Sequence, residues 1–105
     1  MAQFHETVLG DGTSRVRLEG EIDLAVKDDL IECVRASLAH AVRVELDFAE
    51  VSFIDSSGLG ALVLLHKEAG GVGKKLFLMN LSPAIDHLLE ITGLHGVFDV
   101  LPQQP

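Results

Sequence analysis

The chain of 105 residues carries 16 acidic and 8 basic side chains, for a net charge of -8, and 48% of its residues are hydrophobic. This length predicts one domain with a single core, and the acidic balance argues against nucleic-acid binding, which needs a dense basic face. No apolar run approaches the roughly 20 residues that a membrane helix requires, so we expect no membrane partner.

The first part of the chain predicts a hairpin followed by a helix. Gly10-Asp11-Gly12 is typical of a hairpin turn, and residues 15–19 alternate charged and apolar side chains, as in a half-buried strand. Apolar residues recur at helical spacing over residues 24–39, beginning with Leu24. Asp23 is placed to cap this helix, because its carboxylate can accept hydrogen bonds from the free amides of the first turn.

The rest of the chain alternates strand and helix. Residues 42–48 alternate apolar and charged side chains and predict a strand, and residues 57–69 predict a helix. Residues 76–79 form a short, wholly apolar strand. A third helix opens at Ser82-Pro83, with the cap and the first-turn proline in the favoured order. A last short strand is predicted within residues 97–101.

Such alternation builds parallel strands joined by crossover helices, which are right-handed in almost all cases. Residues 1–105 are therefore predicted to form a single α/β domain. Its mixed sheet would begin with the hairpin and continue with parallel strands, with the helices packed mainly on one face. The other face should meet water, because Arg43, Glu45 and Asp47 place a charge at every second position of one strand. The apolar strand 76–79 then needs cover on that face, which we expect from a terminal segment.

The most informative stretch is Asp55-Ser56-Ser57-Gly58-Leu59-Gly60, between a strand-like and a helical apolar run. Helix capping is the simplest interpretation of its polar residues. However, a cap needs one such residue, and Gly58 and Gly60 each cost on the order of 1 kcal/mol against Ala in a helix. Two explanations of the glycines stay open. We favour close approach of a partner to the backbone over tight packing of the helix on the sheet.

The predicted topology brings three strand-to-helix loops to one edge of the sheet. Parallel strands point their carboxyl ends the same way, so residues 20–23, 55–58 and 80–83 should gather there. Three helix N-termini would face this patch, and their unpaired amides could accept a phosphate. The carboxylates of Asp23 and Asp55 oppose that attraction.

Four segments together closely resemble the STAS domain and, more narrowly, the bacterial anti-sigma factor antagonists. In chain order they are Gly20-Glu21-Ile22-Asp23, Asp55-Ser56-Ser57-Gly58-Leu59-Gly60, Ser82-Pro83-Ala84, and Thr92-Gly93-Leu94 followed by Phe98. The likeness runs from about residue 14 to residue 98. The six-residue central motif is highly specific, whereas the other three motifs are weak individually and useful together.

This resemblance implies a partner switch that is controlled by phosphorylation. In the family, the unmodified antagonist binds an anti-sigma factor that is also a serine kinase, and the sigma factor is released. The kinase then phosphorylates a serine of the motif with ATP, the pair separates, and a serine phosphatase resets the cycle. The modified serine directly follows the Asp, so it is Ser56 here, with Ser57 as the secondary candidate and Asp55 expected to orient the hydroxyl.

The implied partner-binding surface consists of the residues Asp23, Asp55, Ser56, Ser57, Gly58, Leu59 and Gly60. The alternative to a kinase-driven switch is a STAS module in another role, either a sensor or scaffold or a regulatory part of a transporter. Both alternatives share the fold and the edge site. Phosphate transfer from a dedicated kinase distinguishes the antagonist from them.

Other functional signals are weak. The glycine-rich residues 70–75 lack the first glycine and the hydroxyl residue of a phosphate-binding loop, and the five histidines show no metal-ligand spacing. Neither Ser56 nor Ser57 has the flanking glycines of a hydrolase nucleophile. We therefore expect a non-enzymatic regulatory domain without cofactor or metal. The single Cys33 and a start unlike a signal peptide indicate the cytoplasm. Residues 102–105 are expected to form a flexible tail, and self-association stays open.

Overall fold

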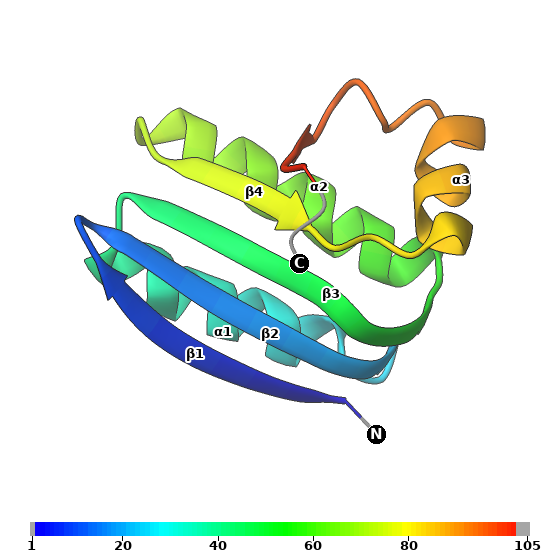
Figure 1. Cartoon of the computed structure of the whole chain (residues 1–105), viewed down its shortest axis with the longest axis horizontal. Coiled ribbons are helices and arrows are strands. Elements are labelled where there is room, and N and C mark those ends of the chain that lie inside the picture. Colours follow the sequence, from blue (N-terminus) through cyan, green and yellow to red (C-terminus); the bar gives the residue numbers. More distant parts are fainter. Residues whose placement is uncertain (1, 103–105) are drawn as a thin grey trace.

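The computed structural model describes residues 2–102, which form a sheet with helices after three of its strands (Figure 1). In chain order the elements are β1 (Gln3–Gly10), β2 (Thr13–Ile22), α1 (Lys27–His40), β3 (Arg43–Ile54), α2 (Ser56–Gly71), β4 (Lys75–Met79), α3 (Pro83–Ile91) and β5 (Asp99–Val100). The strands lie in chain order; β1 and β2 are antiparallel, and each later pair is parallel. The predicted fold class is confirmed. Most of the predicted tail, residues 103–105, lies outside the described residues.

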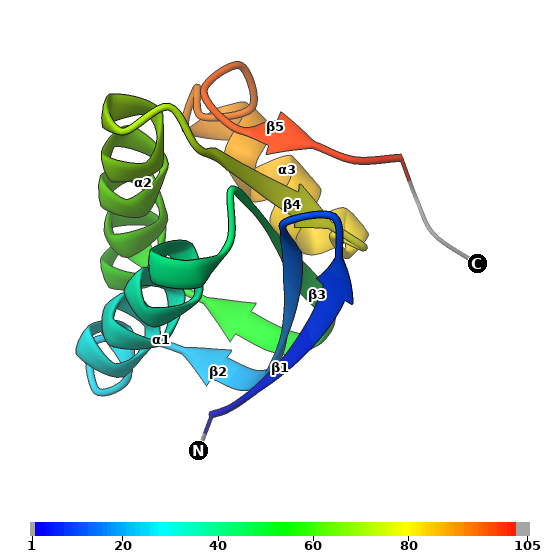
Figure 2. The same ribbon diagram turned by 90° about the vertical axis from the view of Figure 1, so that its left-hand side faces the viewer.

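The helices α1 and α2 cover one face of the sheet, and Figure 2 shows them together on that side. The core lies between these helices and the inward-facing strand positions. Its fully or almost fully buried members include Val16, Leu18, Val44, Leu46, Phe48 and Leu78 from the strands and Leu30, Val34, Leu62 and Leu65 from the two helices. Figure 1 places α3 at the end of the sheet, beside the carboxyl end of β4. Among the described residues, no helix is long and apolar enough to cross a membrane.

The helix α1 begins later than its apolar pattern predicts. Its N-cap is Val26, whose side chain makes no capping hydrogen bond. Asp23 instead closes a turn ahead of the helix, because its carboxylate accepts a hydrogen bond from the backbone N–H of Ala25 at 3.1 Å. Leu24 lies in this turn and is 65% exposed. The prediction that Asp23 caps the helix is therefore wrong, since the local turn uses its carboxylate before the helix starts.

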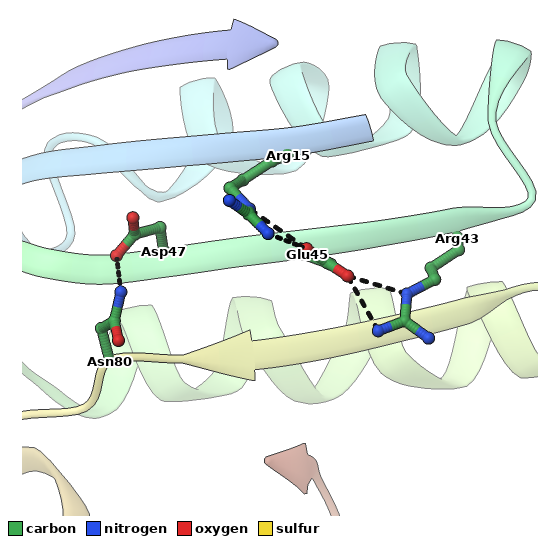
Figure 3. A network of polar contacts seen from close by, with 5 residues as sticks. All are labelled: Arg15, Arg43, Glu45, Asp47 and Asn80. Carbon is green, nitrogen blue, oxygen red and sulfur yellow. Dashed lines mark hydrogen bonds and ion pairs between the residues drawn. The ribbon is translucent and has the colours of Figure 1, made fainter. Parts of the chain in front are cut away.

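The outer face of the sheet carries the predicted charges, but one of them is buried. Glu45 is only 5% exposed. Arg15 donates two hydrogen bonds to its Oε1 at 3.1 and 2.8 Å, and Arg43 donates from Nε to Oε2 at 2.8 Å (Figure 3). Burial raises the pKa of Glu45, but the hydrogen bonds from the two arginines outweigh burial and hold this pKa below its ordinary value.

Arg43 also covers the apolar strand β4. Its guanidinium carbon lies 4.0 Å from the ring centroid of Phe77, which is the register neighbour of Glu45. This geometry is a cation–π contact. Arg43 of the neighbouring strand therefore covers part of the outer side of Phe77, while the end of the C-terminal segment from which cover was also expected lies outside the described residues.

The strand β3 extends beyond β4. Asp47 is the register partner of Met79, the last residue of β4, whereas β3 continues to Ile54. On its other side β3 stays paired with β2, up to the pair of Ile54 with Ile22. The terminal part of β3 therefore has a strand on one side only, and the residues that follow β4 lie on the other.

Candidate functional site

The helix α2 begins with an aspartate cap. The Oδ1 atom of Asp55 accepts hydrogen bonds from the backbone N–H groups of Ser57 at 2.9 Å and of Gly58 at 3.1 Å. These are two of the first-turn amides that have no partner within a helix. Capping therefore explains Asp55, and it gives no role to the hydroxyl groups of the two serines that follow.

Ser56 is the first residue of α2 and is exposed, whereas Ser57 is partly buried. Within residues 2–102, neither side-chain hydroxyl takes part in a hydrogen bond. The carboxylate of Asp55 is bound to the helix amides, so the expected role of orienting the Ser56 hydroxyl is not seen in this conformation. The Ser56 hydroxyl is thus accessible to solvent, and it makes no hydrogen bond to the described residues.

The two glycines of the motif have different surroundings. Gly58 is buried, and a Cβ atom there would lie 2.7 Å from the carbonyl oxygen of Ile22 and 2.7 Å from Cγ1 of Ile54. Gly60 is exposed, with no neighbouring atom within 4 Å of such a Cβ. Leu59 is 6% exposed and belongs to the core. Gly58 and Leu59 therefore serve the packing of α2, which corrects the expectation that they lie on the partner-binding surface.

The ends of β2 and β3 bring Asp23 and Asp55 to the same edge of the sheet. Each aspartate directly follows one member of the register pair formed by Ile22 and Ile54. The backbone N–H of Asp55 also donates to the carbonyl oxygen of Ile22 at 3.2 Å. With Ser56, Ser57 and Gly60, these two aspartates remain at the accessible edge, which we call the Ser56 patch.

The helix amides expected to accept a phosphate are partly occupied. Asp55 binds two of them in α2, and in α3 the Oγ atom of Ser82 accepts from the backbone N–H of Ile85 at 3.2 Å. Residues 44–66 and 76–105 also contain no Lys or Arg. The Lys or Arg residues of its own strand and helix are Arg43, at the opposite end of β3, and Lys67, in the C-terminal half of α2, so neither lies beside a phosphate on Ser56.

A groove beside the Ser56 patch was not predicted from the sequence. It is lined by Ser52, Phe53, Ile54, Ser82, Ala84, Ile85 and Leu88. It lies where β3 extends past β4 and faces α3. Strict alternation would place Phe53 on the same face as the buried Val51, but the register with β2 shifts between these two residues, and Phe53 is exposed. Among the described residues, no cluster of His, Cys, Asp and Glu could hold a metal ion.

Comparison with known proteins gives a consistent set of relatives. The model of the STAS domain family matches residues 5–103. An anti-sigma-B factor antagonist of Staphylococcus epidermidis is 35% identical over 98 residues, which are 90% of this chain and 89% of that protein. The crystal structure of an anti-sigma factor antagonist from Mycobacterium paratuberculosis gives a TM-score of 0.85 at 25% identity, over 97% of this chain and 86% of that one. The unphosphorylated form of the antagonist SpoIIAA has the same fold, with a TM-score of 0.78 at 22% identity over 95% and 89% of the two chains.

Proposed function

The chain belongs to the STAS domain family, and on this premise we propose that it is an anti-sigma factor antagonist whose binding is switched off by phosphorylation of Ser56. The unphosphorylated form binds an anti-sigma factor, and the sigma factor is released. That anti-sigma factor is also the serine kinase, and a separate serine phosphatase restores the binding form. The protein itself carries out no catalysis in this cycle.

The observation that carries the proposal is the accessible Ser56 hydroxyl at the start of a helix that its neighbour already caps. Transfer of a phosphoryl group needs a hydroxyl that a kinase can reach, and Ser56 is exposed without a hydrogen-bond partner among the described residues. Asp55 already caps two of the first-turn amides, so the start of the helix does not depend on the Ser56 hydroxyl. Ser57 is the weaker acceptor because it is partly buried.

The chemical step belongs to the partner kinase. The Ser56 Oγ atom attacks the γ-phosphorus of ATP, the bond between that phosphorus and the bridging oxygen breaks, and ADP leaves. The hydroxyl proton passes to a base of the kinase. The products are phosphoserine 56 and ADP, so atoms and charge balance without any cofactor of the antagonist.

The phosphate acts at the docking surface rather than on the fold. It adds about -1.5 to -2 charges beside Asp55, in a segment without Lys or Arg. In the complex it would also face the phosphates of the nucleotide in the kinase. Burying such a group without a countercharge, against like charge, weakens binding strongly. Turning a mostly bound population into a mostly free one takes a change of roughly 5 kcal/mol, which this combination supports.

The test is the intact mass of the protein after incubation with ATP and each candidate anti-sigma kinase from the same genome. Ser56→Ala is incubated in parallel. One added phosphate in the parent chain and none in the variant is the expected result. If the folded parent gains no phosphate with any candidate, the switch is absent, and a sensor, scaffold or transporter-associated role takes its place.

A further inference from the structure

The groove beside the Ser56 patch has an exposed aromatic wall. Phe53 is 50% exposed, although it lies near the end of a central strand whose neighbours Val51 and Ile54 are buried. The strand β4 stops at the level of Asp47, and within residues 2–102 no other strand pairs with this side of β3 beyond that point. The opposite wall comes from α3, mainly Ala84 and Leu88. Figure 1 shows α3 standing beside this end of the sheet.

The groove is large enough for a side chain of a partner protein. Its volume is about 290 Å³. This volume is at the lower limit of pockets that enclose cofactors and drug-sized ligands, which range from about 300 to 1,000 Å³. Protein interfaces, in contrast, are anchored by single large apolar side chains that fill pockets of one partner near the centre of the contact.

The charge around the groove restricts the partner further. Both segments that line it fall within residues 44–66 and 76–105, which contain no Lys or Arg. The exposed Glu21 is the register neighbour of Phe53 on β2, and Asp55 follows two residues after Phe53. The rim of the groove is therefore acidic, and a complementary partner surface carries Lys or Arg around its apolar anchor.

We propose that this groove is the second half of the docking surface for the anti-sigma factor, and that it receives an apolar side chain flanked by basic residues. This inference rests on the proposed function, because it names that partner as the occupant. Ile54 lines the groove and Ser56 follows two residues later, so both sites belong to one continuous surface. Seating the anchor in the groove positions the kinase at Ser56.

The first experiment measures the affinity of the kinase that phosphorylates Ser56 for two apolar-to-polar variants, by calorimetry. Phe53→Ser removes the wall of the groove, and Val72→Ser is the matched control, since Val72 is a 68% exposed apolar residue after the far end of α2. We expect Phe53→Ser to weaken binding by about tenfold or more and Val72→Ser to leave binding unchanged. Thermal unfolding of both variants checks that they are folded.

A second variant keeps the test decisive if Phe53→Ser unfolds. Ala84→Leu fills the groove from an exposed helix position, so the core stays intact, and it should weaken binding as well. If the variants of Phe53 and Ala84 both bind like the parent while Ser56 is still phosphorylated, the groove is not the docking site. If no kinase modifies Ser56 in the parent, the proposed function is wrong, and the anti-sigma factor is then excluded as the occupant of the groove.

The charge part of the proposal has its own pair of variants. Glu21→Lys reverses a charge at the rim of the groove, and Glu32→Lys makes the same change in net charge on the exposed side of α1. We expect Glu21→Lys to weaken binding more than Glu32→Lys, and the difference to shrink at high salt, because salt screens exposed charges. Equal effects of the two variants would show that the partner surface is not basic at this point.

Discussion

A Cβ atom on Gly58 would lie 2.7 Å from the carbonyl oxygen of Ile22, closer than such atoms approach in folded proteins. The same oxygen accepts a hydrogen bond from the backbone N–H of Asp55 at 3.2 Å. The start of α2 is therefore held against the end of β2 through one carbonyl group. The exposed Ser56 lies between Asp55, which is hydrogen-bonded to the sheet, and Gly58, which packs against it.

The first prediction follows from this contact. Gly58→Ala should destabilise the protein by about 1–3 kcal/mol, because the added methyl group overlaps backbone that cannot easily move. Gly60→Ala is the matched control, since no atom lies within 4 Å of its Cβ position. It should leave stability unchanged or raise it by up to about 1 kcal/mol, because alanine favours a helix over glycine. Urea unfolding of both variants measures the difference, and equal stabilities would contradict the contact.

Comparison of the two glycines shows what the sequence could and could not reveal. The order of strands and helices and the position of Ser56 follow from local periodicity and from the motif. The opposite surroundings of Gly58 and Gly60 do not, because they depend on how α2 is rotated against the sheet. The turn at Asp23 and Leu24 depends in the same way on how the chain leaves β2.

The groove at Phe53 was beyond prediction for a related reason. It exists because β3 is longer than β4, and the local pattern of either strand says nothing about the other's length.

The burial of Glu45 is a third feature that the sequence did not reveal. The alternation of charges placed it correctly on the outer face, but its burial involves Arg15 of β2, which pairs with it only after the strands assemble, together with Arg43 of its own strand.

The second prediction concerns the charge at Ser56. Ser56→Ala should stay folded, keep binding the anti-sigma factor and accept no phosphate. Ser56→Asp should also stay folded but lose binding, because it places a permanent charge beside Asp55 at the centre of the docking surface. Calorimetric titration with the partner kinase compares the two. Binding of Ser56→Asp as tight as that of the parent would show that charge at this position does not control the complex.

The third prediction concerns the cap. Asp55→Ala should lower the free energy of unfolding by about 0.5–2 kcal/mol, because the amides of Ser57 and Gly58 lose their acceptor. Asp55→Asn keeps an acceptor oxygen and should be close to the parent. Ser56→Ala should have no such effect, since its hydroxyl makes no hydrogen bond among the described residues. Thermal unfolding of the three variants separates the roles, and an Asp55→Ala protein as stable as the parent would exclude the cap.

The fourth prediction concerns the buried carboxylate of Glu45. Glu45→Gln should destabilise the protein by about 1–3 kcal/mol at neutral pH, because a neutral amide replaces the carboxylate that receives hydrogen bonds from Arg15 and Arg43. Glu68→Gln is the control, since Glu68 pairs with Arg35 in a similar two-bonded way at the surface, where solvent screens the pair. Its effect should be smaller. Urea unfolding at pH 7 compares the two variants.

The dependence of stability on pH tests the same carboxylate independently. The pKa of Glu45 is lowered in the folded protein, while an unfolded glutamate titrates at about 4.3. The stabilisation from its ionised form is therefore complete above about pH 4.3 and is lost as the pH falls from there through the folded pKa. Glu45→Gln has no proton to take up, so its stability should fall less steeply with acid than that of the parent. Unfolding midpoints measured from pH 7 to pH 3 should converge for the two proteins. Parallel curves over this range would mean that the ionised Glu45 contributes nothing to the stability of the sheet.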